Sequence, residues 1–161
     1  MSKDEPFFLA PYFEKIEAPN SADARALYAY WRGLADPPAL PQRRQITMED
    51  LSALGCLDSV FILEPTQDGS DWRYRLLGTR IVQMYGSEVT SIPLREHMTP
   101  EEADLAIALS NHVRDTLTPI FLKARFVSGD HQVPIETMSL PILGRDEHDV
   151  WLFGGTFFTP R

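Results

Sequence analysis

Cysteine, positive charge and long apolar runs are all scarce in this sequence, and each shortage excludes a class of function. Cys56 is the one cysteine among 161 residues, so the chain can form neither an internal disulfide nor a metal site built from several cysteines. Lysine and arginine number 15 against 23 aspartates and glutamates, for a net charge of −8. We therefore expect no nucleic-acid partner, because a phosphate backbone is bound by a concentrated patch of positive charge.

The sequence also has no segment typical of membrane insertion or export. No stretch approaches the roughly 20 apolar residues that span a bilayer, and the excess of acid disfavours an anionic membrane surface. The first residues, MSKDEPFFLAPYF, are acidic early and carry a short apolar run broken by Pro11, unlike a secretory signal. We expect no membrane partner and a cytoplasmic location.

The stretch at 72–86, WRYRLLGTRIVQMYG, predicts a strand, a turn and a short helix. Apolar and arginine side chains alternate at its start with the period of a half-buried strand. Gly78 permits a tight bend, Thr79 can cap the helix, and Gly86 stands where helices often end in a left-handed residue. The stretch carries no metal, phosphate-binding or nucleophile motif, so we interpret it as scaffold.

The N-terminal part predicts an irregular arm, a helix and a proline-rich connection over residues 1–45. The arm is rich in aromatic residues, so part of it should dock on another surface. The helix is expected to begin near Ser21, and its apolar residues recur at i, i+3, i+4 and i+7. These residues are Leu27, Tyr30, Trp31 and Leu34. The stripe either packs on its own domain or forms a dimer or partner interface, and the sequence favours neither.

Five strands and a long helix are predicted in the rest of the chain. Thr99-Pro100-Glu101-Glu102 is a strong helix start, and the helix should run to about Leu117. The first two strands should form a hairpin and the last three an antiparallel meander. The predicted strands are 60–63, 72–77, 120–127, 133–143 and 150–158. This order indicates an α+β fold, a five-stranded antiparallel sheet with helices on one face and an N-terminal helical extension.

Several motifs in this order resemble a PAS domain. They are RLLGTRIVQMYG at 75–86, SIPL at 91–94 followed by TPEE at 99–102, and the glycines Gly154 and Gly155 of the last strand. A narrower resemblance covers most of the chain, from about Asn20 to Phe158. There LYAYW at 27–31, FIL at 61–63 and RYRLLGTRI at 73–81 resemble a bacterial family of small stand-alone PAS proteins of unassigned function. The resemblance implies a PAS-like domain over residues 46–161, preceded by the arm, helix and connection.

The resemblance implies a regulatory or sensory module rather than an enzyme, because PAS-like proteins bind haem, flavins, small metabolites or other proteins. The first hypothesis is a signalling module that acts by protein–protein contact, as a homodimer through the helix at 21–34 or with another signalling protein. The second is a metabolite sensor with an interior site between helix and sheet. Its polar groups would be Arg75, Tyr85 and His112. The third and less favoured hypothesis is a small cone-shaped isomerase or dehydratase. Such an enzyme needs an Asp–His or Tyr–Asp pair in its cavity, whereas the adjacent Asp130 and His131 fall in a predicted turn.

No cofactor or metal is required by the sequence. In the PAS-like proteins that this chain resembles, haem is ligated by a histidine of the long helix. His112 lies on that predicted helix at the border of its apolar face, but no second feature supports haem binding. Photoactive flavin chemistry needs a cysteine on the helix after the second strand, whereas Cys56 precedes the first strand and reads as a small apolar residue. The remaining histidines have no metal-ligand spacing. Haem is therefore disfavoured, and flavin is nearly excluded.

Overall fold

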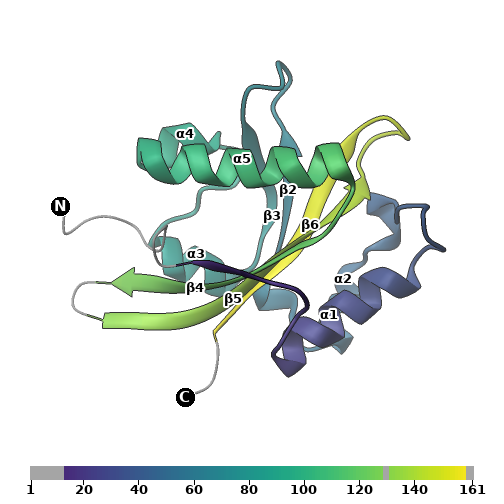
Figure 1. Cartoon of the computed structure of the whole chain (residues 1–161), viewed down its shortest axis with the longest axis horizontal. Coiled ribbons are helices and arrows are strands. Elements are labelled where there is room, and N and C mark those ends of the chain that lie inside the picture. Colours follow the sequence, from purple (N-terminus) through teal and green to yellow (C-terminus); the bar gives the residue numbers. More distant parts are fainter. Residues whose placement is uncertain (1–12, 129–130, 159–161) are drawn as a thin grey trace.

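The structure is a computed structural model, and it describes residues 13–128 and 131–158. Within these residues an antiparallel sheet of six strands has the order β1-β4-β5-β6-β2-β3 (Figure 1). The strands are β1 (Glu14–Ile16), β2 (Val60–Pro65), β3 (Trp72–Leu77), β4 (Ile120–Ser128), β5 (His131–Leu143) and β6 (Val150–Phe158). The helices are α1 (Ala22–Gly33), α2 (Met48–Ala53), α3 (Thr79–Tyr85), α4 (Leu94–His97) and α5 (Pro100–Thr116), with short 3-10 helices at Arg43–Gln45 and Leu57–Ser59.

The predicted α+β class, hairpin and meander are confirmed. β2 pairs with β3, and β4, β5 and β6 pair in succession, all antiparallel. The capping box at the start of α5 is also confirmed, with Thr99 and Glu102 each bonding the backbone N–H of the other. Gly86 ends α3 with a φ of 83°, as its position predicted. Thr79 is the first residue of α3 rather than its cap, because Gly78 occupies the cap position.

The prediction of five strands is wrong by one, because β1 adds a strand at the edge of the sheet. Glu14 pairs with Lys123 and Ile16 with Phe121 on β4. This segment falls in the part of the chain for which we predicted an irregular arm, and its three residues are too few to show a strand period. Its strand geometry comes from pairing with β4, which no local pattern reveals.

Helices cover both faces of the sheet, not one as predicted. Side chains of β2 alternate between two buried clusters, with Val60 and Ile62 on one face and Phe61 and Leu63 on the other. A strand that is apolar on both faces must be covered on both. The helices α1 and α2 pack on the first face, and α3, α4 and α5 pack on the second.

The helix α1 is fixed to the sheet at both of its ends. At its start the buried carboxylate of Glu136, on β5, accepts hydrogen bonds from the backbone N–H groups of Asn20 (2.6 Å) and Ser21 (2.8 Å). Near its end the indole Nε1 of Trp31 donates to the carbonyl oxygen of Pro141, at 2.9 Å. Leu27, between them, is fully buried. The N-terminal helix therefore belongs to the same packed body as the sheet.

Gly154 lets two strands and an aromatic ring approach closely in the middle of the sheet. A Cβ at this position would overlap the backbone carbonyl of Met138 and lie 2.8 Å from the ring of Phe61. Since Phe61 faces the second cluster, this glycine helps to set the floor beneath α5. No helix in the described part of the chain is long and apolar enough to cross a membrane.

Replacing Trp31 by alanine should lower the free energy of unfolding by about 3–5 kcal/mol, since it removes a buried aromatic side chain and leaves a cavity. Urea unfolding of the purified variant measures this loss. The control is Ala29→Ser on the exposed side of α1, which should change stability by no more than about 0.5 kcal/mol. A Trp31→Ala variant as stable as the control would show that α1 does not pack on the sheet.

Candidate functional site

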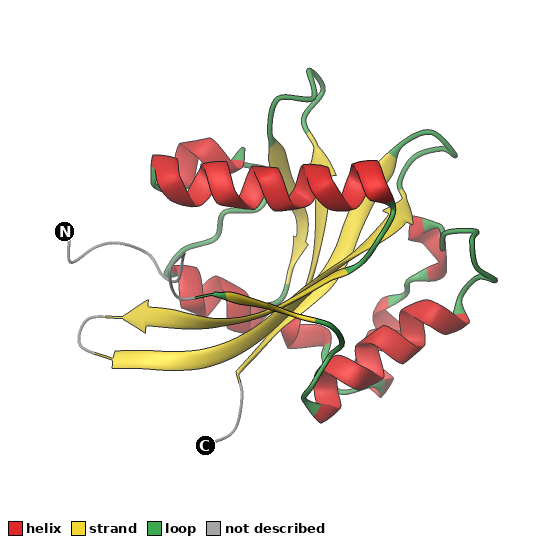
Figure 2. Cartoon of the chain, in the orientation of Figure 1, coloured by secondary structure: helices red, strands yellow, loops and turns green. Residues whose placement is uncertain are grey.

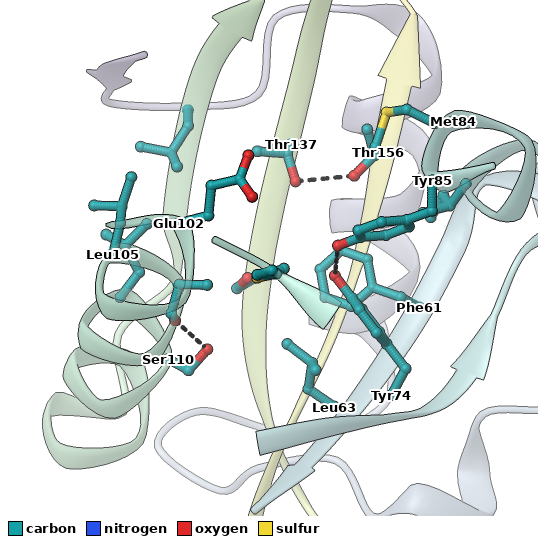
Figure 3. A pocket seen from close by; sticks show the side chains of 16 residues that line it. Phe61, Leu63, Tyr74, Met84, Tyr85, Glu102, Leu105, Ser110, Thr137 and Thr156 are labelled. Carbon is teal, nitrogen blue, oxygen red and sulfur yellow. Dashed lines mark hydrogen bonds between the residues drawn. The ribbon is translucent and has the colours of Figure 1, made fainter. Parts of the chain in front are cut away.

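A cavity of about 90 Å³ lies between α5 and the sheet, on the face opposite α1. Its wall is mostly apolar and comes from α3, α5 and five strands. The polar side chains on it are those of Tyr74, Tyr85, Glu102, Ser110, Thr137, Ser139 and Thr156. Figure 3 shows six of them pointing toward one space, from α5 on one side and from the strands and α3 on the other: Tyr74, Tyr85, Glu102, Ser110, Thr137 and Thr156. The cavity is the place where polar groups from distant parts of the sequence meet inside the molecule.

Two tyrosines form the most distinctive polar feature of the cavity. The hydroxyls of Tyr74, on β3, and Tyr85, at the end of α3, lie 2.9 Å apart and share a hydrogen bond (Figure 3). Burial raises the pKa of Tyr74 to about 12. Burial also raises the pKa of Tyr85 well above its ordinary value, with a smaller contribution from Tyr74. Both phenols are therefore neutral at physiological pH, and a neutral phenol can donate and accept hydrogen bonds.

Glu102 is placed on the cavity by the cap of α5. Its side-chain Oε1 accepts a hydrogen bond from the backbone N–H of Thr99 at 3.0 Å, and Thr99 Oγ1 accepts from the backbone N–H of Glu102 at 3.2 Å. Glu102 is 1% exposed, and its charge contributes to the raised pKa of Tyr85. The same motif that starts the helix thus brings a carboxyl group into the interior.

Four other hydroxyls line the cavity, those of Ser110, Thr137, Ser139 and Thr156, from α5 and from neighbouring strands. Ser110 donates to the carbonyl oxygen of Ala106, one turn earlier in α5, at 2.8 Å. Thr137 and Thr156, on β5 and β6, share a hydrogen bond of 3.2 Å. Since neither threonine hydroxyl nor serine hydroxyl ionises in the physiological range, these groups offer neutral hydrogen-bond contacts to an occupant.

His97 packs against Tyr85 of the tyrosine pair, a contact that the sequence did not predict. Its ring meets that of Tyr85 edge to face, with centroids 5.6 Å apart. Burial lowers the pKa of His97, although Asp71 and Glu96 oppose the shift. None of the helices predicted from the sequence includes His97, whereas the structure places it at the end of the short helix α4. A four-residue helix without a side-chain cap gives little signal in the sequence.

Of the three predicted ligand residues, the structure places only Tyr85 at the cavity. Arg75 is exposed, because the alternation of β3 directs Tyr74 to the cavity and Arg75 to the opposite side. There it lies near Arg43, whose pKa is lowered by burial and, secondarily, by the charge of Arg75. His112 is exposed on α5 and does not line the cavity. The expectation that Arg75 and His112 reach this space is therefore corrected.

The four residues of the predicted interface stripe all contact their own domain. Leu27 and Trp31 are buried against the sheet, and Leu34 is half-buried against the same cluster. Tyr30 is half-buried, and its hydroxyl donates to the carboxylate of Asp50 on α2 at 2.8 Å. The aromatic arm predicted before this helix lies almost entirely outside the described residues, which begin at Phe13.

The residues at the cavity do not fit a haem or a photoactive flavin. The helix histidine that would ligate haem, His112, is exposed and outside the cavity wall. Cys56 lies in the cluster on the opposite face, and burial raises its thiol pKa to about 11, which keeps the thiol protonated. The described residues include no group of three or more potential metal ligands. Asp130 and the side chain of His131, considered above as a catalytic pair, lie outside the described part.

A family model described as a PAS domain matches residues 20–157. The chain belongs to the PAS family. The match confirms the resemblance predicted from the sequence motifs, and it includes α1 as well as the strands that follow it. PAS domains are generally regulatory or sensory modules rather than catalytic ones. No curated protein matches this chain.

The tyrosine pair should make the stability of this PAS domain fall at high pH. Above about pH 10 an unfolded tyrosine loses its proton, whereas Tyr74 and Tyr85 keep theirs in the folded state. Because the folded state then binds more protons, stability decreases as pH rises, by up to about 1.4 kcal/mol per pH unit for each such group.

The variant Tyr85→Phe removes one of these two groups, so its stability should decline less steeply than that of the wild type between pH 10 and 12. Urea unfolding at a series of pH values measures both slopes, and contributions from groups that do not contact Tyr85 cancel in the comparison. Equal slopes would show that Tyr85 ionises as easily in the folded protein as in the unfolded chain.

Proposed function

We propose that this PAS domain is a sensory module whose cavity binds a small uncharged molecule. The observation that carries the proposal is the meeting of the Tyr74–Tyr85 hydroxyl pair with an apolar wall in an interior space between α5 and the sheet. Ligand pockets commonly combine an apolar wall with a few placed polar groups. Here the polar groups orient the ligand and the apolar wall excludes water from it.

The volume of the cavity limits the size of the ligand. At about 90 Å³ it holds the equivalent of about three water molecules, and it is smaller than the cavity of about 150 Å³ that admits benzene in another protein. A ligand that fits without movement therefore has few non-hydrogen atoms. Met84 and Met98 line the cavity, and the flexible methionine side chain can repack to admit a larger one.

The charge of the wall limits the chemistry of the ligand. Among the described residues that line the cavity, Glu102 is the sole acidic residue and neither lysine nor arginine occurs. An anion would meet no opposite charge there and would lose its hydration, which is costly. Hydroxyls of tyrosine, serine and threonine instead match neutral donors and acceptors such as an alcohol, a carbonyl or an amide.

We further propose that the module acts without catalysis. The isomerase or dehydratase alternative needs an Asp–His or Tyr–Asp pair, and the described residues of the cavity wall include neither aspartate nor histidine. A phenol with a raised pKa, such as that of Tyr85, is also slow to give up its proton near neutral pH.

A matched pair of substitutions on α5 tests the ligand site. Ala106 lines the cavity, whereas Ala108 is exposed on the same helix. Ala106→Leu should fill the space and abolish binding, and Ala108→Leu should leave binding unchanged. Native mass spectrometry of the purified proteins, compared with their denatured masses, would identify a retained ligand present in the wild type and Ala108→Leu but absent from Ala106→Leu.

A ligand lost during purification would escape mass spectrometry. A second experiment therefore titrates the proteins with 2-propanol, a small uncharged molecule, as a probe of the cavity. Backbone amide NMR shifts around Tyr85 and Thr137 should saturate with 2-propanol in the wild type and in Ala108→Leu, and should not respond in Ala106→Leu. Equal responses in all three proteins would place binding elsewhere and remove the proposal.

Contact with a second chain, in a homodimer or with a signalling partner, is the second proposal, since a sensory module passes its state to another protein. With Leu27 and Trp31 buried, the part of α1 available for such contact consists of the exposed residues Ala22, Asp23, Arg25, Ala29, Arg32 and Gly33. The native mass spectra described above also measure oligomeric mass. A dimer that becomes a monomer in Ala29→Arg would support α1 as its interface.

A further inference from the structure

A polar cleft of about 530 Å³ lies beside the last turn of α5, at one end of the sheet. Its wall comes mainly from the β2–β3 turn and the β5–β6 turn, and Figure 2 shows both turns at the end of the sheet that α5 crosses. The volume lies within the range of about 300–1,000 Å³ found for ligand pockets. In the part of the chain that the structure describes, this cleft and the candidate cavity share no lining residue.

Three arginines and two acidic residues supply the charge of this cleft among the described residues that line it. The arginines are Arg73 on β3, Arg114 on α5 and Arg145 in the β5–β6 turn, and the acidic residues are Glu64 and Asp149. Positive charge is therefore in excess here, although acidic residues outnumber basic ones in the chain as a whole. A local excess of positive charge attracts an anion.

The two carboxylates of the cleft already have partners that leave one arginine unused. The buried Oε2 of Glu64 accepts a hydrogen bond from Arg73 Nε at 2.8 Å. Asp149 Oδ2 accepts one from the indole Nε1 of Trp151 at 2.9 Å. Arg145 Nη2 lies 3.8 Å from Glu64 Oε1, a distance that allows an ionic contact but is too long for a hydrogen bond. The exposed guanidinium of Arg145 therefore donates to no acceptor within the described residues.

Arg114 is held at the cleft by a buried tryptophan. Its guanidinium carbon lies 5.8 Å from the centre of the Trp72 ring, within the range of a cation–π contact. The indole Nε1 of Trp72 in turn donates to Oδ1 of Asn111 on α5, at 2.9 Å. Arg114 Nε donates to Asp115 at 2.9 Å, whereas its two terminal nitrogens, like those of Arg73, have no hydrogen-bond partner in the described part of the chain. Both arginines thus have fixed positions and unused donors.

We propose that this cleft binds a phosphate group, either free phosphate or that of a small phosphorylated molecule. Guanidinium groups form paired, charge-assisted hydrogen bonds with oxyanions. The three guanidiniums come from three separate elements, so a tetrahedral phosphate, with its several oxygens, suits them better than a planar carboxylate with two. Glu64 and Trp72 fix Arg73 and Arg114 before a ligand arrives, and less side-chain freedom is then lost on binding.

Titration with inorganic phosphate, followed by backbone amide NMR at constant ionic strength, tests the proposal. Constant ionic strength separates binding from general screening of charge. In the wild type the amide shifts of Gly69 and Arg145 should change and saturate. Arg114→Gln and Arg145→Gln should each weaken binding by about tenfold or more, since each removes hydrogen bonds to a charged ligand. The matched control is Arg80→Gln, which removes an exposed arginine of α3 outside the cleft and should bind phosphate as the wild type does.

Glucose 6-phosphate, titrated in the same way, identifies the source of the phosphate group. Tighter binding than that of inorganic phosphate would assign a phosphorylated molecule to the cleft, whose volume exceeds what a phosphate ion fills. Weaker binding would assign free phosphate. Either result supports a phosphate site, provided that the two cleft variants lose it.

Three outcomes would overturn the proposal. The first is the lack of a saturable response to both probes in the wild type. The second is equal affinity in the wild type, Arg114→Gln and Arg145→Gln, which would place phosphate elsewhere. The third is acetate binding as tightly as phosphate, which would remove the preference for a tetrahedral anion. Ala106→Leu, which fills the cavity, should leave phosphate binding unchanged, so the result is independent of the function proposed above.

Discussion

The fold depends on one constraint, a sheet that is apolar on both faces. Val60 and Ile62 of β2 face one cluster, and Phe61 and Leu63 face the other. Neither face can be left in water, because each would expose an apolar surface spanning several strands. The helix α1 is therefore required by the sheet rather than added to it. Glu136 sets its position by binding the backbone at its start.

The two faces are covered differently, and the candidate site lies on the face opposite α1. Large side chains such as Leu27, Trp31 and Phe153 fill the face beneath α1. On the other face Gly154 adds no side chain, and the polar residues Thr137 and Thr156 interrupt the apolar surface beneath α5. Polar groups at an interior position need partners, and here they bond to each other around a cavity. The site thus arises where the core is incompletely filled.

Much of the fold was predictable from the sequence, whereas the site was predictable only in part. Caps, prolines and side-chain periods predicted α1, α5 and five strands, because these signals are local. The strand β1 was missed, since its geometry comes from its partner β4. Alternation in β3 does show that Tyr74 and Arg75 face opposite ways, but which face holds the cavity depends on how the helices pack.

The contacts that hold each helix indicate which helix could change position if the cavity were occupied. The ends of α1 are bonded to Glu136 and to the backbone of Pro141, on the face away from the cavity. The helix α5 instead lies over the cavity, and its residues Glu102 and Ser110 form part of the wall. A ligand can shift a conformational equilibrium only as far as it binds the two states differently. A ligand bound as proposed would contact α3, α5 and the strands. The positions of α3 and α5 are therefore the ones that such a ligand would bias, with α1 as the fixed reference.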